Sequence, residues 1–214
     1  RLASNLVHVT FPPYNVEVAL EKPVTGHDIL RHELFHQVVQ REIANTDQKN
    51  ECLAIRQNQL ITNLNSPVSF SQLEITPVMF YSVEGHEVYR RSLVFLFGMA
   101  VASCFPDLVA TVEHVLPEGF FCELQDMDGV DPVIVKQIED KMKELVALDA
   151  PLTEERVPFD LALEYFGKTN RPFTSLLIMS NNEQAVLVDK CNDYCDMHHG
   201  PLVSSTGRIK HFVL

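Results

Sequence analysis

Over its first eighty residues the chain alternates apolar and polar positions in short stretches, with one segment of helical spacing between them. Residues 6–11 and 16–20 alternate as half-buried strands do, and the Pro-Pro-Tyr-Asn run at 12–15 predicts the turn between them. A single apolar stripe at helical spacing predicts a helix from Asp28 to about Glu42, with Asp28 as its N-cap or first-turn acid. Further short apolar runs predict strands at 53–55, 59–63 and 74–80.

After Gly85 the apolar runs lengthen. Residues 87–104 predict a long apolar helix that Phe105-Pro106 ends, and residues 132–148 predict an amphipathic one. Paired strands are expected at 109–115 and 119–124, around a turn at 117–119. Shorter elements complete the pattern: a helix at 158–166 and strands at 176–179 and 185–188.

This order of elements predicts an α+β fold in two units. A hairpin, a helix and further strands form a small unit at residues 1–83, in which a sheet packs on one helix. Residues 84–214 form a larger unit, in which a long central helix lies against an antiparallel sheet. We place the boundary at residues 81–85, and we find no repeat and no low-complexity tract.

The net charge and the length of the apolar runs limit which kinds of partner the chain can bind, namely nucleic acids and membranes. A net charge of −12 over 214 residues argues against broad, nonspecific phosphate binding, although a local basic patch remains open. The longest apolar run, residues 93–105, is shorter than the roughly 18 residues that a membrane helix needs. We therefore expect no membrane partner. Because the chain begins at Arg1, we expect it to be part of a longer protein.

The five cysteines have no spacing typical of a disulfide scaffold, so we expect free thiols in a reducing cytoplasm. Cys191 and Cys195, followed by His198 and His199, suggest a zinc site. However, no second Cys/His pair stands at zinc-finger spacing, and the intervening residues are typical of a turn. We therefore predict no metal here.

Two other motifs invite an enzymatic interpretation. His32-Glu-Leu-Phe-His36 matches the pattern of zinc proteases, but both histidines fall off the predicted apolar stripe and we expect them in water. Residues 162–169 fit a relaxed phosphate-binding loop, but Leu-Glu-Tyr-Phe is helix-forming. We expect a helix end capped at Gly167 instead, so the chain itself should carry no kinase site.

Three segments resemble known families. The run from Ala54 to Pro67, AIRQNQLITNLNSP, resembles a motif of the TGS domain, a ubiquitin-like β-grasp module. Residues 84–92, EGHEVYRRS, are similar to the Glu-Gly-x-Glu-Val-x-Arg-His-Ser of threonyl-tRNA synthetases. Residues 196–212, DMHHGPLVSSTGRIKHF, resemble the segment that closes the editing domain of those enzymes. The resemblance covers most of residues 5–214 and implies a TGS-like unit followed by an editing-like one.

The resemblance also locates a site. In the synthetases a His-x3-His pair and a Cys-x3-His pair form a metal or deacylation site, and these four positions here hold Arg91, Phe95, His198 and Leu202. Arginine stays protonated and phenylalanine offers no lone pair, so one surviving histidine cannot hold that metal. The resemblance therefore implies a degenerate editing site with no catalytic residue and no cofactor of its own.

The same two-part region resembles the N-terminal part of uridine kinase-like proteins, and residues 89–93 and 112–123 are closer to that group. We prefer this interpretation: a noncatalytic, cytoplasmic region with a C-terminal kinase-like domain in cis, which alone would use ATP and Mg²⁺. The alternatives are a threonyl-tRNA synthetase-like parent, with tRNA binding or editing, and a protein-interaction module.

A guanidinium at a former metal position restores positive charge and can bind a phosphate. We therefore predict a cleft for a nucleotide or RNA, whose basic residues are Arg90, Arg91, Arg208, Lys210 and His211. The competing interpretation pairs Arg91 with Glu87, one helical turn earlier. His198 and His199 are expected to be structural, because we find no acid at a recognisable spacing to orient them.

Overall fold

The structure is a computed structural model, which describes residues 6–44, 51–68, 70–116, 119–125, 129, 131–169, 172–180 and 184–214. It confirms the α+β class. By its internal contacts the chain divides into two units, residues 1–91 with 200–204 and residues 92–199 with 205–214, and each is described by itself. The division into domains predicted from the sequence, 1–83 and 84–214, stays a prediction.

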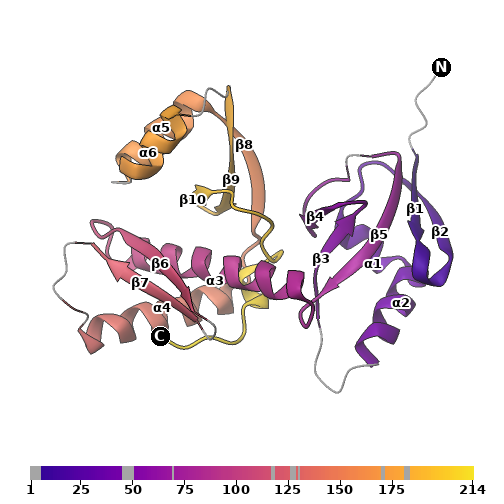
Figure 1. Ribbon diagram of the computed structural model, residues 1–214, viewed down its shortest axis with the longest axis horizontal. Helices are drawn as coiled ribbons and strands as arrows, with labels where there is room; N and C mark the ends of the chain where they lie inside the picture. Colours follow the sequence, from indigo (N-terminus) through magenta and orange to yellow (C-terminus); the bar gives the residue numbers. More distant parts are fainter. Residues whose placement is uncertain are drawn as a thin grey trace. The chain divides into compact units, whose positions relative to one another are not determined.

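The first unit is built on a mixed five-stranded sheet with the strand order β2-β1-β5-β3-β4, the arrangement of a β-grasp fold (Figure 1). β1 and β5 are parallel, whereas the other neighbouring strands run antiparallel. The strands predicted from alternation are confirmed. Their bounds, with the short 3-10 helix η1 that joins the first two, are β1 Leu6–Phe11, η1 Pro12–Tyr14, β2 Val16–Glu21, β3 Cys52–Gln57, β4 Leu60–Asn63 and β5 Gln72–Met79.

The predicted helix of this unit is divided in two, α1 (Gly26–Arg31) and α2 (Glu33–Ala44). Thr25 is the N-cap of α1, and Asp28 is its first-turn acid. The Asp28 carboxylate accepts a hydrogen bond from the Thr25 backbone N–H at 2.9 Å, and the Thr25 hydroxyl accepts one from the Asp28 N–H. Both helices pack on one face of the sheet, where the core comprises Val7, Val9, Phe11, Ile29, Phe35, Ile55, Leu64 and Ile75, among others.

The break between the two helices changes the interpretation of the protease-like motif. His32 has a ψ of 132°, so the two histidines do not lie on one continuous helix. The expectation that both face water was wrong for His32, because its Nδ1 is buried without a hydrogen-bond partner. His36 is exposed, as expected. The geometry of a His-Glu-x-x-His metal site is therefore not formed.

The second unit contains two sheets and most of the long helix α3 (Val83–Cys104), which begins in the first unit. One sheet is the hairpin of β6 (Ala110–Leu116) and β7 (Gly119–Leu124); the residues at 117–118 of its predicted turn lie outside the described part of the chain. The other sheet has three antiparallel strands in the order β10-β9-β8. The bounds of the remaining elements are α4 Pro132–Leu148, β8 Thr153–Pro158, α5 Phe159–Lys168, α6 Pro172–Ser180, β9 Ala185–Cys191, β10 Tyr194–Met197 and η2 Thr206–Arg208.

The three-stranded sheet has helices on both faces (Figure 1). On one face Val186 and Val188 pack with Phe166 of α5 and Ile178 of α6. On the other face Tyr194 of β10 meets α3. A side chain at Gly98 of α3 would lie 2.5 Å from the Tyr194 hydroxyl, so the glycine is what admits the tyrosine.

Three short segments depart from the sequence prediction. Residues 176–179 lie in α6 and are not a strand; a short apolar run does not distinguish the two states, and Pro172 suits a helix start. β8 was not foreseen, because its charged sequence shows no apolar alternation and its strand state comes from pairing with β9. The helix of the phosphate-loop-like segment ends at Lys168 and is capped by Thr169, not by Gly167.

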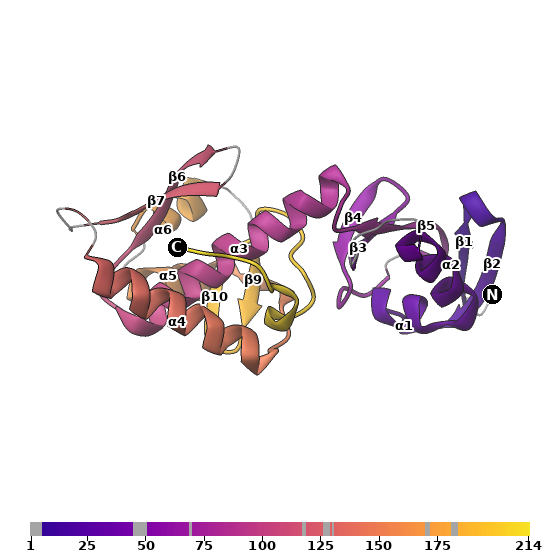
Figure 2. The same ribbon diagram turned by 90° about the horizontal axis from the view of Figure 1, so that it is seen from below.

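The end of the chain belongs to both units. Residues 205–214 run past α4 in the second unit, where the Thr206 hydroxyl donates to the Leu145 carbonyl at 2.7 Å (Figure 2). Residues 200–204 belong to the first unit, where Asn63 and Asn65 donate side-chain hydrogen bonds to the carbonyls of Val203 and Ser204. Among the described residues, no helix is long and apolar enough to span a membrane.

Candidate functional site

Three acidic residues lie in a row across the three-stranded sheet. Asp189 on β9 is paired directly with Glu154 on β8 and with Asp196 on β10. Residues paired directly in antiparallel strands project from the same face, so the three carboxylates are neighbours. Asp189, in the middle, is only 3% exposed. We call Glu154, Asp189 and Asp196 the carboxylate row.

His198 joins this row just after β10. Its ring Nδ1 lies 2.9 Å from Asp189 Oδ1, and its backbone N–H donates to the Leu187 carbonyl at 3.1 Å. The contact turns Nδ1 toward Asp189 and Nε2 to the other side of the ring. Asp189 thus orients His198 from the neighbouring strand, at a spacing that the sequence did not reveal, and the structural role expected for His198 stays a prediction.

The surroundings of Asp189 oppose its negative charge. Burial is the main influence and raises the pKa of its carboxyl group above the ordinary value of 3.8, and the nearby charges of Glu154 and Asp196 act in the same direction. The hydrogen bond from His198 and its charge act against this shift. A buried carboxylate between two further acids is an environment that proteins build at functional sites more often than elsewhere.

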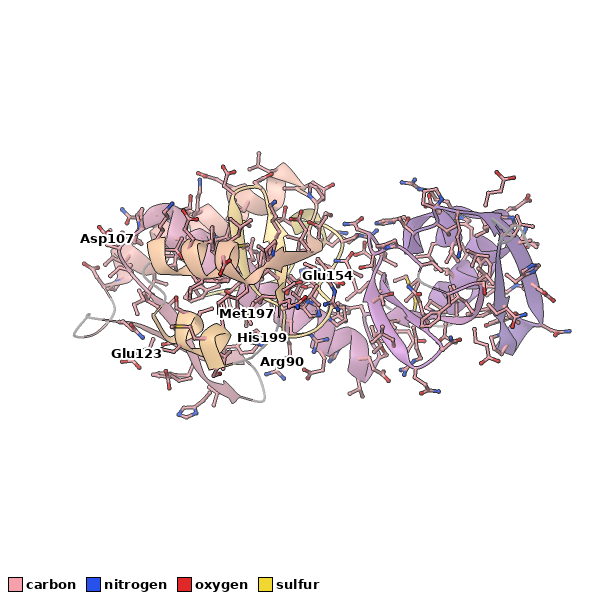
Figure 3. The ribbon with its side chains drawn as sticks, turned by 90° about the horizontal axis from the view of Figure 1, so that it is seen from above. Arg90, Asp107, Glu123, Glu154, Met197 and His199 are labelled. Atoms are coloured by element: carbon pink, nitrogen blue, oxygen red, sulfur yellow. The ribbon has the colours of Figure 1, made fainter. Side chains whose placement is uncertain are left out.

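Figure 3 labels residues of the strands and loop that surround His198. Glu154 comes from β8, and Met197 and His199 flank His198 at the end of β10. One ligand atom from each of Glu154, Asp189 and His198 can be chosen so that all three lie within 4.8 Å of one another. The arrangement brings two carboxylates and one imidazole to one point of the sheet.

The pairing of β9 with β10 places Cys191 and Cys195, which suggested a zinc site, on opposite faces of the sheet. Cys191 pairs with Tyr194, and Cys195 pairs with Lys190, so the two sulfurs project from opposite faces. Cys195 packs on the side of α5 and α6, whereas Cys191 shares the face of the carboxylate row. The two sulfurs are therefore not placed to bind one ion together.

Arg91 is engaged with the backbone of its own unit. Its Nε donates to the Pro201 carbonyl at 3.3 Å, and its Nη1 lies 3.9 Å from Glu87 Oε2. The guanidinium also covers Gly200, where an added Cβ would lie 3.0 Å from Nε and 3.1 Å from Cζ. The competing interpretation, an Arg91–Glu87 pair, thus describes one of the contacts that this side chain makes.

Two of the other three positions of the degenerate editing site are part of apolar packing. Phe95 is 5% exposed and stacks edge-on against Tyr194, with ring centroids 5.1 Å apart. Leu202 is 3% exposed in the first unit. His198 is the position among the four that lies in a polar cluster of titratable groups, and the acids beside it come from β8, β9 and β10.

The predicted anion-binding residues are divided between the units. Arg90 and Arg91 belong to the first unit, and Arg208, Lys210 and His211 belong to the second. Lys210 and His211 are exposed, while Arg208 is half-buried in η2. An anion site made by these residues stays a prediction.

Comparison with known proteins shows what the chain is similar to, although no family model matches it. It is 34% identical over 132 residues to the threonine–tRNA ligase of Herminiimonas arsenicoxydans, which is 61% of this chain and 21% of that enzyme. It is 31% identical over 167 residues to the ligase of Syntrophotalea carbinolica, covering 77% of this chain and 26% of the enzyme. The ligase of Prochlorococcus marinus is 28% identical over 163 residues, with 76% and 25% covered.

These matches support the resemblance to threonyl-tRNA synthetases, and nothing in them links the chain to uridine kinases. The chain spans about a quarter of the length of the curated relatives it matches. The chain is therefore similar to one region of threonine–tRNA ligases.

Proposed function

We propose that this chain is the tRNA-directed region of a threonyl-tRNA synthetase-like protein, and that it binds the acceptor end of a tRNA without hydrolysing an aminoacyl bond. Of the two parents weighed from the sequence, the comparisons favour the synthetase-like one, because the reported relatives are threonine–tRNA ligases. A kinase-like domain in cis, with its ATP and Mg²⁺, stays a prediction that sequencing the parental transcript beyond the Leu214 codon would test.

The observation that carries this proposal is the burial of Phe95 and Leu202. Both side chains fill apolar packing, and neither offers a lone pair to a metal or to a reacting water. Arg91 is held by Pro201 and Glu87 and stays charged, so it cannot act as a base at neutral pH. Three of the four chemical groups that the resemblance implies for an editing site are therefore replaced in this chain.

The charge of the chain indicates which part of the tRNA is bound. A net charge of −12 opposes extended contact with the phosphate backbone, so recognition should concentrate on the terminal nucleotide and its aminoacyl group. Each phosphate contact to a single strand steepens the salt dependence of log K by roughly 0.7. We expect a shallow dependence, with a slope no steeper than about −2.

A fluorescent acceptor-stem minihelix carrying threonine through a nonhydrolysable 3′-amide bond provides the test. We expect saturable binding by fluorescence anisotropy, weaker binding of the minihelix that lacks threonine, and little loss of affinity between 50 and 200 mM salt, in contrast to the steep loss typical of backbone binders. A DNA hairpin of equal charge is the control. Equal affinity for the hairpin and the two minihelices would refute the proposal.

Hydrolysis is a second candidate function, because Asp189 holds His198 at 2.9 Å. A histidine oriented by a buried carboxylate is the usual arrangement of a general base that activates water. Deacylation of Ser-tRNA and Thr-tRNA by the native chain and by His198→Asn would decide between the two. Release of the amino acid that disappears in the variant would replace the binding-only function with hydrolysis.

A further inference from the structure

The carboxylate row brings three like charges together on one face of the sheet. Like charges directly opposite each other destabilise an antiparallel pair, and here Asp189 has an acid opposite it on both sides. Burial adds to the effect, since a carboxylate that is 3% exposed has lost most of its hydration. With a neutral His198, the row has a formal charge of −3.

We infer that Glu154, Asp189 and His198 hold a divalent cation. Their ligand atoms lie within 4.8 Å of one another, while bonds of about 2.0–2.2 Å place two ligands of one ion at most roughly 4.4 Å apart. Small side-chain rotations close this difference. An ion of charge +2 reduces the formal charge around the row from −3 to −1.

The donor set indicates the class of ion. Carboxylate oxygens suit Mg²⁺ and Mn²⁺, whereas an imidazole nitrogen suits Zn²⁺ and the other first-row divalent ions. Two carboxylates with one imidazole therefore select a first-row divalent cation such as Mn²⁺ or Zn²⁺ over Mg²⁺ or Ca²⁺. Water or a substrate oxygen would complete the coordination.

The register of one sheet positions these ligands. Glu154 and Asp189 are cross-strand partners, and His198 follows β10, which pairs with β9. The set shares only His198 with the four positions implied by the resemblance. It departs from our sequence-based prediction that the chain binds no metal, since two of the ligands come from strands that this prediction did not consider.

Metal binding can be measured on the chain alone, so its outcome is independent of tRNA binding. The metal-stripped protein is titrated with Mn²⁺ while electron paramagnetic resonance follows the free ion, and Zn²⁺ is titrated by calorimetry. We expect one ion per chain, with an affinity at least about tenfold lower in Asp189→Asn and in Glu154→Gln. Electron spin-echo modulation from a coordinated nitrogen should be present in the native protein and absent in His198→Gln.

Glu155→Gln is the matched control. It removes the same charge one residue away, but Glu155 projects from the other face, where it pairs with Lys190 at 3.1 Å, so Mn²⁺ affinity should not change. Far-UV circular dichroism verifies that each variant folds. Less than one ion of Mn²⁺ or Zn²⁺ per chain, equal affinities in native protein and Asp189→Asn, or nitrogen modulation that persists in His198→Gln would overturn the inference. The minihelix assay repeated in EDTA shows whether tRNA binding fails separately.

Discussion

Replacing Gly200 with alanine should destabilise the first unit through two separable effects. The backbone of Gly200 has a φ of +128°, a conformation that residues with a side chain rarely adopt, and holding one there costs about 1–3 kcal/mol. The new methyl group would also lie 3.0 Å from Arg91 Nε and 3.1 Å from its Cζ. Overpacking of this kind costs about 1–3 kcal/mol. The guanidinium lies at the end of a flexible side chain, so its movement should relieve part of this cost.

A double-mutant cycle separates the two effects. In an Arg91→Ala background the steric contact is gone, so Gly200→Ala should cost only the backbone term, about 1–3 kcal/mol. In the native background the cost should be larger by about 1 kcal/mol, because the displaced guanidinium also loses its hydrogen bond to the Pro201 carbonyl. Urea denaturation followed by far-UV circular dichroism measures all four proteins.

Two results would refute this reasoning. If Gly200→Ala alters the free energy of unfolding by less than about 0.5 kcal/mol, the range of a neutral surface change, the left-handed backbone is not required there. If the cost is the same with and without Arg91, the guanidinium does not pack on Gly200.

Three further changes test other parts of the fold. Asp28→Ala removes the two hydrogen bonds that the Asp28 carboxylate accepts from the backbone N–H and the hydroxyl of Thr25, and it should cost about 1 kcal/mol by urea denaturation. These bonds lower the pKa of the Asp28 carboxyl group in the folded state. The stability that Asp28 contributes is therefore complete above its ordinary pKa of 3.8 and is lost as the pH falls through the lowered folded value. A difference in unfolding free energy between native protein and variant that does not shrink below pH 4, about the ordinary pKa of Asp, would contradict this. Asp189→Asn removes a buried charge flanked by acids and keeps an oxygen acceptor for the imidazole, so in EDTA its thermal unfolding should occur at the native temperature or above, and a marked decrease would argue against the unfavourable row. Gly85→Ala would place a methyl group 2.0 Å from a backbone carbonyl oxygen at the end of β5 and should cost about 3 kcal/mol or more of unfolding free energy. In the control variant Gly167→Ala the methyl group meets nothing within 4 Å in α5, so this change should be neutral or stabilising. Similar stabilities of the two variants would show that the backbone around Gly85 is not rigid.

Much of the fold could be predicted because its longer elements carry their periodicity in the sequence. The alternation of residues 6–11 and the amphipathic pattern of 132–148 each predicted the correct element. The predictions failed where tertiary contacts decide the local state. The pattern of 28–42 continues through His32, where the helix breaks, and the charged strand β8 is held by its pairing with β9.

The candidate site could be predicted only in part, because its ligands come from different strands. The resemblance identified His198, but Asp189 and Glu154 are nine and 44 residues away from it in sequence. One signal was present: Asn192-Asp193 between two short strands predicts a hairpin, and its register places Asp189 opposite Asp196. Glu154 had no such signal, since β8 itself could not be foreseen.

The five residues Gly200–Ser204 make the first unit discontinuous in sequence. Val203 is fully buried and Ser204 is 3% exposed, and both are held through their carbonyls by Asn63 and Asn65. A gene segment that ends at Arg91 would therefore encode an incomplete unit, with two amide groups and an apolar surface uncovered. Recombination cannot transfer this unit between proteins by moving one exon-like block, because its last five residues must travel with it. The two units should have been inherited together, and substitutions in Asn63 or Asn65 should covary with the segment at 200–204 among homologues.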